Sequence, residues 1–212
     1  YGYLPVWQLW GQDNYCMIGN HAIPVIVDAI QKGIPGIDIE KAYEAVKKSS
    51  LTSHPNSPFD VWDKYGYMPE NIQSQSVSIT LEFSFDDWCV ARLAKKLGKE
   101  DDYRYFLNLA LSYQTLIDPE TKYMRGRDSK GDWRTPFTPV AYQGPGSVHG
   151  WGDITEGFTM QYTWYVPQDP YGLMDCMGGK DKYVAKLDSM FSEQRYWHGN
   201  EPCHQVAYMF NY

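Results

Sequence analysis

The sequence predicts an all-α domain in which paired helices surround an axis and long loops gather at one end into a cleft. Five or more segments repeat apolar residues every three or four positions, and no segment shows a sustained strand-like alternation. The segments 51–75 and 118–154 between the helices are too long to be simple connections, and loops of this length usually carry function.

The first two expected helices have clear ends. Apolar residues fill positions 21–32 and stop at Gly33, which suits a buried helix closed by a left-handed residue. Asp38 stands where an N-cap is needed, and Lys47 and Lys48 complement the carboxyl end of the helix that follows it. Both helices are therefore predicted with their boundaries.

The longest expected helix begins near Val77 and continues to Gly98, with apolar residues stepping by three or four. Asp101 or Asp102 is expected to cap the next helix. Two shorter helices are predicted at about 156–165 and 180–190.

Composition limits the class of partner. The 212 residues suit about one domain at ~100–200 residues per domain. The net charge of −7 argues against a nucleic-acid partner, which would need a basic surface, and no apolar run approaches the ~20 residues of a membrane helix. The 18 Tyr, 8 Trp and 8 Phe suit a surface that is both apolar and wet, because Tyr and Trp rings carry a polar tip.

The four cysteines are scattered without a C-x-x-C pair, so we expect separate buried thiols. They do not identify the cellular compartment, because a secreted chain with a few disulfides would also fit this pattern. The chain starts without Met and ends without a helix stop. We interpret it as an excerpt from a longer polypeptide.

The sequence lacks the H-E-x-x-H, P-loop and G-x-S-x-G motifs, which lowers support for several enzyme classes. Three polar motifs remain. In the first, Asn20 and His21 follow a glycine and precede the buried helix at 21–32. They are either functional side chains or a plain helix start, with Asn20 as the cap and His21 in the first turn.

The second motif centres on Glu156, which follows a Gly- and Trp-rich loop and precedes a segment rich in aromatic rings. A carboxyl group half-buried among rings suits a general acid. The alternative is a first-turn glutamate that interacts with the helix dipole, with Thr155 as the cap.

The third motif spans 198–204. Asn200, Glu201 and the carbonyl of Gly199 can supply oxygen ligands for Ca²⁺, which prefers six to eight of them. His198 and His204 lack a zinc-site spacing. A polar loop that holds its own shape is the alternative for this motif.

The acidic pair Asp86 and Asp87 falls inside the long helix, where adjacent side chains point in different directions. We therefore expect one of the two carboxylates, and not both, to face a cleft.

An ordered set of motifs along nearly the whole chain resembles glycoside hydrolase family 92. The motifs are Gly2-Tyr3-Leu4-Pro5, Met17-Ile18-Gly19-Asn20-His21-Ala22, Lys32-Gly33-Ile34, Gly66-Tyr67-Met68-Pro69, Leu81-Glu82, Asp86-Asp87-Trp88-Cys89, Thr155-Glu156-Gly157, Gln161-Tyr162-Thr163-Trp164 and Gly199-Asn200-Glu201-Pro202. Each motif alone is modest, whereas the ordered set is specific.

The resemblance implies a calcium-dependent, exo-acting and inverting α-mannosidase. Family members join an N-terminal β-sandwich to a catalytic (α/α)6 barrel, so residues 1–212 would be a fragment of the barrel that lacks the sandwich and the C-terminal part. The implied substrate is a mannose-containing glycan, most plausibly with α-1,2-linked ends. The implied location is periplasmic, cell-surface or secreted.

The resemblance also implies roles for particular residues. Glu156 matches the general acid that protonates the leaving glycosidic oxygen. Asn200 and Glu201 match the stretch that helps to build the calcium and mannose site. Further pocket residues by resemblance are Asn20, His21, His198 and His204.

Two departures from the family pattern matter. Phe158-Thr159-Met160 stands where the family commonly has Asn-Ala-Trp, which bears on the leaving-group side of the pocket. The family's catalytic base is an aspartate C-terminal to every motif matched here, so we expect the isolated chain to lack turnover.

Two other functions stay open. One is a non-catalytic helical carbohydrate-binding or scaffold domain, whose aromatic side chains would bind glycans without cleaving them. The other is a helical-toroid lyase, which would need a Tyr or His base and an acidic polysaccharide. The negative net charge disfavours the lyase.

Overall fold

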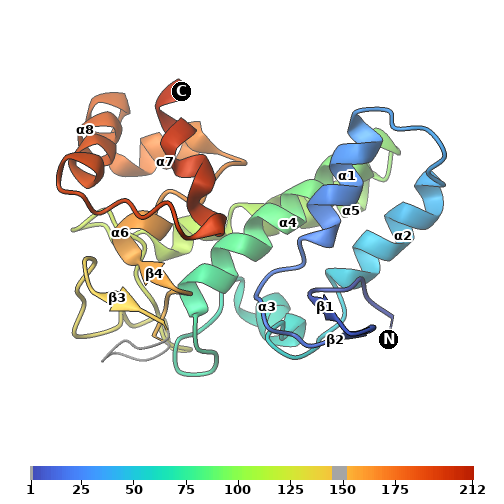
Figure 1. Ribbon diagram of the computed structural model, residues 1–212, viewed down its shortest axis with the longest axis horizontal. Coiled ribbons are helices and arrows are strands. Elements are labelled where there is room, and N and C mark those ends of the chain that lie inside the picture. The colour runs from blue at the N-terminus through green and yellow to red at the C-terminus, as the bar shows by residue number, and fades with distance from the viewer. Residues whose placement is uncertain (1, 145–151) are drawn as a thin grey trace. The chain divides into compact units, whose positions relative to one another are not determined.

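The structure is a computed structural model that describes residues 2–144 and 152–212. It forms two compact units, the first from Tyr1–Gly66 with Glu82–Ser112 and the second from Tyr67–Leu81 with Tyr113–Tyr212. Helices dominate both units, and the strands are short (Figure 1). The mostly helical fold is confirmed, whereas the incomplete (α/α)6 barrel stays a prediction.

The first unit begins with a small antiparallel hairpin in which Leu9 pairs with Gln12. Its elements are β1 (Gln8–Leu9), β2 (Gln12–Asp13), α1 (Ala22–Gln31), α2 (Ile39–Ser49), α3 (Phe59–Tyr65), most of α4 (Ser76–Lys96) and α5 (Glu100–Ala110). Residues 76–81 of α4 belong to the second unit.

The helices at 22–31 and 39–49 form as the sequence predicts. Ile23, Val27 and Ile30 of α1 recur at helical spacing and are buried. Gly33 follows with a φ of +72°, the left-handed conformation that glycine adopts without steric cost. Asp38 caps α2 by accepting a hydrogen bond from the Lys41 N–H (3.2 Å).

The predicted cap of α5 is wrong. The helix starts at Glu100, with Lys99 at the N-cap position and no side-chain cap, so Asp101 and Asp102 lie in its first turn. Asp102 instead accepts hydrogen bonds from the Tyr43 hydroxyl and from Lys47 Nζ. An acidic first turn is already stabilised by the helix dipole, which leaves this carboxylate available to join α5 to α2.

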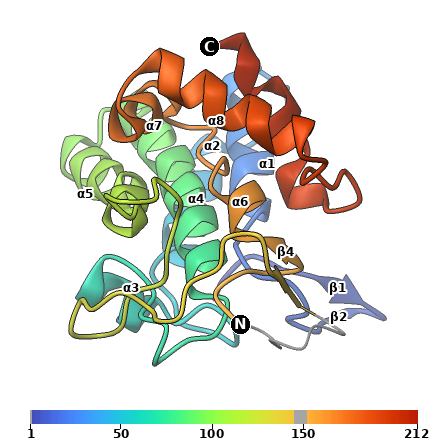
Figure 2. The same cartoon turned by 90° about the vertical axis from the view of Figure 1, so that its left-hand side faces the viewer.

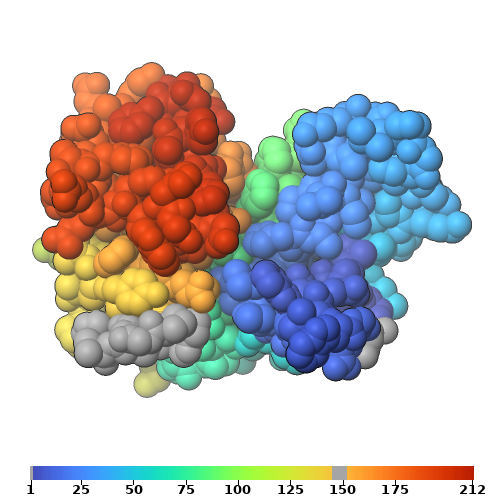
Figure 3. All heavy atoms as spheres, in the orientation of Figure 1, coloured from blue at the N-terminus to red at the C-terminus, as the bar shows by residue number. Residues whose placement is uncertain are grey.

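The second unit contains a short β-pair, in which Tyr142 lies opposite Phe158, and a group of helices. Helices α7 and α8 lie side by side (Figure 2). In the space-filling view, the heavy atoms of residues 159–212, coloured orange to red, form a continuous surface on the face shown (Figure 3). The elements are η1 (Ser112–Leu116), β3 (Tyr142–Gln143), β4 (Gly157–Phe158), α6 (Thr159–Tyr162), α7 (Pro170–Met177), α8 (Lys180–Ser192) and η2 (Glu201–Asn211).

Several elements differ from the prediction. The helix expected at 156–165 is reduced to α6, because residues 157–158 pair as β4 with β3 instead of coiling. Helix α3 lies inside the expected loop 51–75, and α7 follows an unrecognised cap at Asp169, which accepts from the Gly172 N–H (2.9 Å). The long loop 118–154 is confirmed for its described residues, and 145–151 lie outside them.

Two smaller expectations concern cysteines and membrane spans. The four cysteines are free as expected, although Cys16 is exposed while Cys89 and Cys203 are buried. Across residues 2–144 and 152–212, every helix is too short or too polar to cross a membrane.

We predict that two tryptophans of the first unit contribute very differently to the free energy of unfolding. Trp62 is buried, packs edge-on against Phe83 and donates to Asp87 Oδ2 (2.9 Å), whereas Trp10 is 94% exposed. Trp62→Ala should lower the free energy of unfolding by ~3–5 kcal/mol, because it leaves a cavity. Trp10→Ala should change it by less than about 0.5 kcal/mol. Urea unfolding measures both, and equal costs would contradict this packing.

Candidate functional site

The segment 152–155, just before Glu156, docks on the first turn of α4. The carbonyl of Asp153 accepts hydrogen bonds from the backbone N–H groups of Val77 (3.0 Å) and Ser78 (3.2 Å). Two residues later, the Thr155 N–H donates to the Ser78 hydroxyl (2.9 Å). Because the first N–H groups of a helix have no partners within the helix, this docking satisfies both partners.

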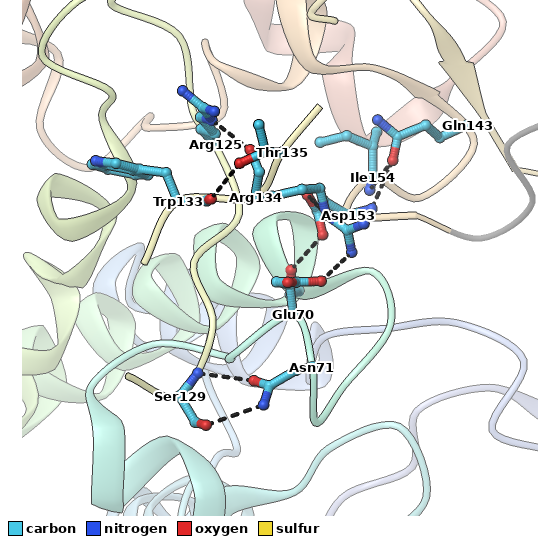
Figure 4. A network of polar contacts seen from close by, with 11 residues as sticks. Glu70, Asn71, Arg125, Ser129, Trp133, Arg134, Thr135, Gln143, Asp153 and Ile154 are labelled. Carbon is cyan, nitrogen blue, oxygen red and sulfur yellow. Dashed lines mark hydrogen bonds and ion pairs between the residues drawn. The ribbon is translucent and has the colours of Figure 1, made fainter. Parts of the chain in front are cut away.

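The Asp153 carboxylate is buried and holds the same segment in place through polar contacts. It accepts from the Ser76 hydroxyl (3.0 Å) and pairs with Arg134 Nε (2.6 Å), while Arg134 also reaches Glu70 (2.5 Å) (Figure 4). Burial raises the pKa of Asp153 against the opposing effect of the Arg134 charge. Gly126 is required nearby, because a Cβ there would collide with this carboxylate.

Gln143 joins the β-pair to the same segment. Its side-chain oxygen accepts from the backbone N–H groups of Asp153 (2.6 Å) and Ile154 (3.1 Å), as Figure 4 shows. Its backbone lies opposite Gly157 in the β3–β4 pair. The residues on both sides of Glu156 are therefore held by hydrogen bonds.

Glu156 itself occupies a strained backbone position, with a φ of +51°. A non-glycine residue in the left-handed region is uncommon and persists where its surroundings determine it. The Asn200 side-chain N–H donates to the Glu156 carbonyl (3.0 Å) and supplies that restraint. The alternative of a first-turn helix glutamate capped by Thr155 is wrong, because α6 starts only at Thr159.

The side chain of Glu156 is half-buried, and Asn200 is buried beside it. Gly144 packs closely against the Glu156 backbone, where a Cβ would lie 2.9 Å from Glu156 Cα. The structure thus brings Glu156 together with the Gly-Asn-Glu-Pro turn, as the proposed roles of both require.

The Gly-Asn-Glu-Pro turn supplies oxygen atoms, which are the ligands that Ca²⁺ prefers. The Asn200 nitrogen is engaged with Glu156, which leaves the amide oxygen as the donor, and the Glu201 carboxylate is exposed at the start of η2. With the Gly199 carbonyl, the turn offers at most four oxygens, fewer than the six to eight that Ca²⁺ prefers. Within the described ranges no three or more His, Cys, Asp or Glu side chains cluster as a metal site, so the remaining oxygens would come from elsewhere.

His198 and His204 lie exposed beside this turn and stack on one another, with ring centroids 4.3 Å apart and planes 16° apart. The ring of His204 bonds through Nε2 to the His198 carbonyl (2.8 Å). His198 Nδ1 forms a hydrogen bond with the Tyr196 hydroxyl (2.5 Å). These contacts support the interpretation that the loop holds its own shape.

His21 lies in the first unit, between two buried carboxylates. Its Nδ1 is 3.0 Å from Asp86 Oδ1 and its Nε2 is 2.9 Å from Glu82 Oε2. Both carboxylates are buried, whereas the imidazole side chain is 41% exposed. One edge of the imidazole ring therefore faces outward, while both of its nitrogens contact carboxylates.

The electrostatics favour the protonated ring. Burial acts to lower the pKa of His21, but the charge and hydrogen bond of Asp86 and the hydrogen bond and charge of Glu82 outweigh it and hold the pKa well above its usual value. Gly19 allows this arrangement, because a Cβ there would lie 2.5 Å from His21 Nε2.

Asn20 is not the helix cap that one alternative predicted. His21 occupies the N-cap position of α1 without a side-chain cap. The Asn20 backbone N–H donates to Asp86 Oδ2 (2.7 Å), and its side-chain nitrogen donates to the Ser49 carbonyl (3.4 Å). Its side-chain oxygen is buried and has no partner in the part of the chain that the structure describes.

Asp87 points away from this cluster, as helical geometry predicts. It accepts from Trp62, and burial raises its pKa well above the usual value. Glu82 is the cluster member for which no role was predicted from the sequence. Its spacing of four residues from Asp86 places both on one helix face, and that was the available signal.

The candidate residues thus fall into two groups, one in each unit. Asn20 and His21 gather around Glu82 and Asp86 in the first unit. The second unit holds Glu156 together with the loop 198–204.

Residues 1–212 match the family model described as the glycosyl hydrolase family 92 catalytic domain. The chain belongs to glycosyl hydrolase family 92. Family 92 membership confirms the resemblance seen in the sequence motifs.

Solved family 92 structures agree. A family 92 α-mannosidase from Bacteroides thetaiotaomicron, in complex with mannoimidazole, is 57% identical with a TM-score of 0.94, over 99% of this chain and 30% of that one. A family 92 inverting mannosidase from the same organism is 33% identical with a TM-score of 0.89, over 100% of this chain and 32% of that one.

A protein from Arthroderma benhamiae named as an uncharacterized secreted glycosidase is 28% identical over 248 residues, covering 100% of this chain and 31% of that protein. The family 92 chain described here therefore spans about a third of the length of these relatives.

We predict a pH-dependent contribution of His21 to stability. Because its folded pKa is raised, this contribution is complete below the unfolded value of about 6.5 and disappears as the pH rises through the folded pKa. The difference in unfolding free energy between the wild type and His21→Gln should therefore be largest in mild acid and shrink in alkali. Urea unfolding from about pH 6 upward measures it, and parallel curves would refute the ion pairing.

Proposed function

We propose that the intact parent protein is an inverting exo-α-mannosidase that removes terminal mannose, with α-1,2 ends as the preferred linkage. The observation that carries the proposal is the fixed, half-buried position of Glu156 beside Asn200. Family membership and the α-mannosidase activity named for the solved relatives support the substrate class.

In this mechanism Glu156 donates its proton to the leaving glycosidic oxygen. Inversion then needs a second carboxylate on the opposite face of the sugar, ~6.5–9.5 Å away, which activates water. By resemblance that base lies C-terminal to the motifs matched here. We therefore propose that the isolated 212-residue chain does not turn over.

Asn200 and Glu201 would hold calcium through their side-chain oxygens. When bound, the ion supplies positive charge and orientation for the sugar hydroxyls O2 and O3. The Asn200 amide contributes in a second way, because its nitrogen holds the Glu156 carbonyl. His198 and His204 would line the pocket beside this turn.

By the family resemblance, Asn20 and His21 would also contribute to sugar binding. Both ring nitrogens of His21 are engaged by carboxylates, so the ring offers its charge and its C–H edge to a sugar rather than a free N–H. Asn20 is buried and would support this part of the site from behind, because its backbone N–H donates to Asp86, which also holds the His21 ring. An exported location, periplasmic, cell-surface or secreted, fits the relative that is named as secreted.

Glu156→Gln in the intact protein should lower kcat for mannobiose by about 10²–10⁴-fold while leaving sugar binding in place, because it removes only the transferable proton. Glu193→Gln, at an exposed position, is the matched control and should keep full activity. Steady-state kinetics and calorimetric binding give the two readouts. Unchanged turnover in Glu156→Gln would reject the role of this residue, and binding without cleavage by the wild type would favour the carbohydrate-binding alternative.

Removal of calcium should abolish the activity of the intact protein. EGTA treatment should lower kcat/KM, and added Ca²⁺ rather than Mg²⁺ should restore it, because the oxygen donors suit a larger ion. Glu201→Gln should raise the Ca²⁺ concentration needed for half-maximal activity. Full activity in EGTA, with intrinsic fluorescence showing a folded protein, would contradict the metal role of Asn200 and Glu201.

A further inference from the structure

An open aromatic hollow of about 480 Å³ lies in the second unit, next to the segment that carries Glu156. Its size falls within the ~300–1,000 Å³ of small-ligand pockets. Its lining residues are Tyr142, Phe158, Gln194, Arg195, Tyr196 and Trp197.

The residues that line the hollow lie close in sequence or in strand pairing to the proposed acid. Phe158 is the second residue after Glu156, and Tyr142 lies opposite Phe158 in the β-pair, with ring centroids 5.6 Å apart. On the other side, Trp197 precedes Asn200 by three residues, and Asn200 holds the Glu156 carbonyl. Both walls of the hollow thus come from segments that also fix Glu156.

The chemistry of the walls suits a sugar ring. Rings with polar tips offer an apolar face to sugar C–H groups and a wet edge to hydroxyl groups. The Trp197 side chain is 45% exposed, and the Tyr142 ring lies edge-on to it at 6.4 Å. Arg195 is exposed and forms no ion pair with residues 2–144 or 152–212, so its guanidinium can donate to hydroxyl groups.

The Trp197 wall is held in place in advance. The buried Gln161 side chain donates to the Trp197 carbonyl (2.9 Å) and accepts from the Trp197 N–H (2.9 Å). A paired restraint of this kind fixes the backbone of an exposed aromatic residue, which lowers the entropy cost of binding.

We propose that this hollow binds the sugar on the leaving-group side of the cleaved bond, and that Trp197 and Phe158 set the preference for that sugar. The proposal rests on the proposed mannosidase function, since the proton from Glu156 goes to the oxygen that this leaving sugar retains.

The test compares two substrates in the intact protein. Mannobiose has a leaving sugar, whereas α-mannosyl fluoride has none. Trp197→Ala should lower kcat/KM for mannobiose about tenfold more than for the fluoride, as expected for one aromatic stacking contact. Trp197→Phe, which keeps a ring, should recover most of the difference, and Phe158→Asn should change the ratio of rates among mannobiose linkages.

Tyr171→Ala removes an exposed aromatic residue outside the hollow and should leave both rates unchanged. An equal loss on both substrates in Trp197→Ala would overturn the proposal and assign Trp197 to packing or to positioning of Glu156. Failure of the wild-type protein to cleave either substrate would instead overturn the mannosidase function itself. The two failures are therefore distinguishable.

Discussion

The hydrogen bond from the Asn200 amide to the Glu156 carbonyl is the constraint on which the candidate site depends. It restrains a glutamate whose φ of +51° costs energy. It also ties two segments that are more than forty residues apart in the sequence. A carboxyl group that must meet one oxygen of a substrate gains from such restraint, because general acid catalysis depends on geometry first.

Buried carboxylates organise the loops of both units in the same way. Asp153 docks one loop on the start of α4 through Ser76 and Arg134. In the other unit, Asp86 holds both the Asn20 backbone and the His21 ring. Each buried charge is stabilised by hydrogen bonds, since an unpaired one would be too costly to bury. These hydrogen bonds hold the long loops in place although the loops contain little helix or strand.

The sequence predicted the elements whose signals are local. The periodicity of α1, the Asp38 cap and the end of α4 near Gly98 depend on residues close in sequence, and all are confirmed. The short helix α6 was overpredicted because the pairing of Gly157 with Gln143 is non-local. The family and the residues near Glu156 followed from motifs, whereas the carboxylates around His21 required the fold, which alone brings residues 21, 82 and 86 together.

The central claim is that the loop restrained by Asn200 presents the Glu156 carboxyl group to the bond being broken. The most direct measurement is a crystal structure of the intact protein with a sulfur-linked mannobiose that resists hydrolysis. The account predicts the Glu156 carboxyl group within hydrogen-bond distance of the bridging sulfur, with the Asn200 amide still on the Glu156 carbonyl. A carboxyl group directed away from that sulfur, with another acid in its place, would contradict it.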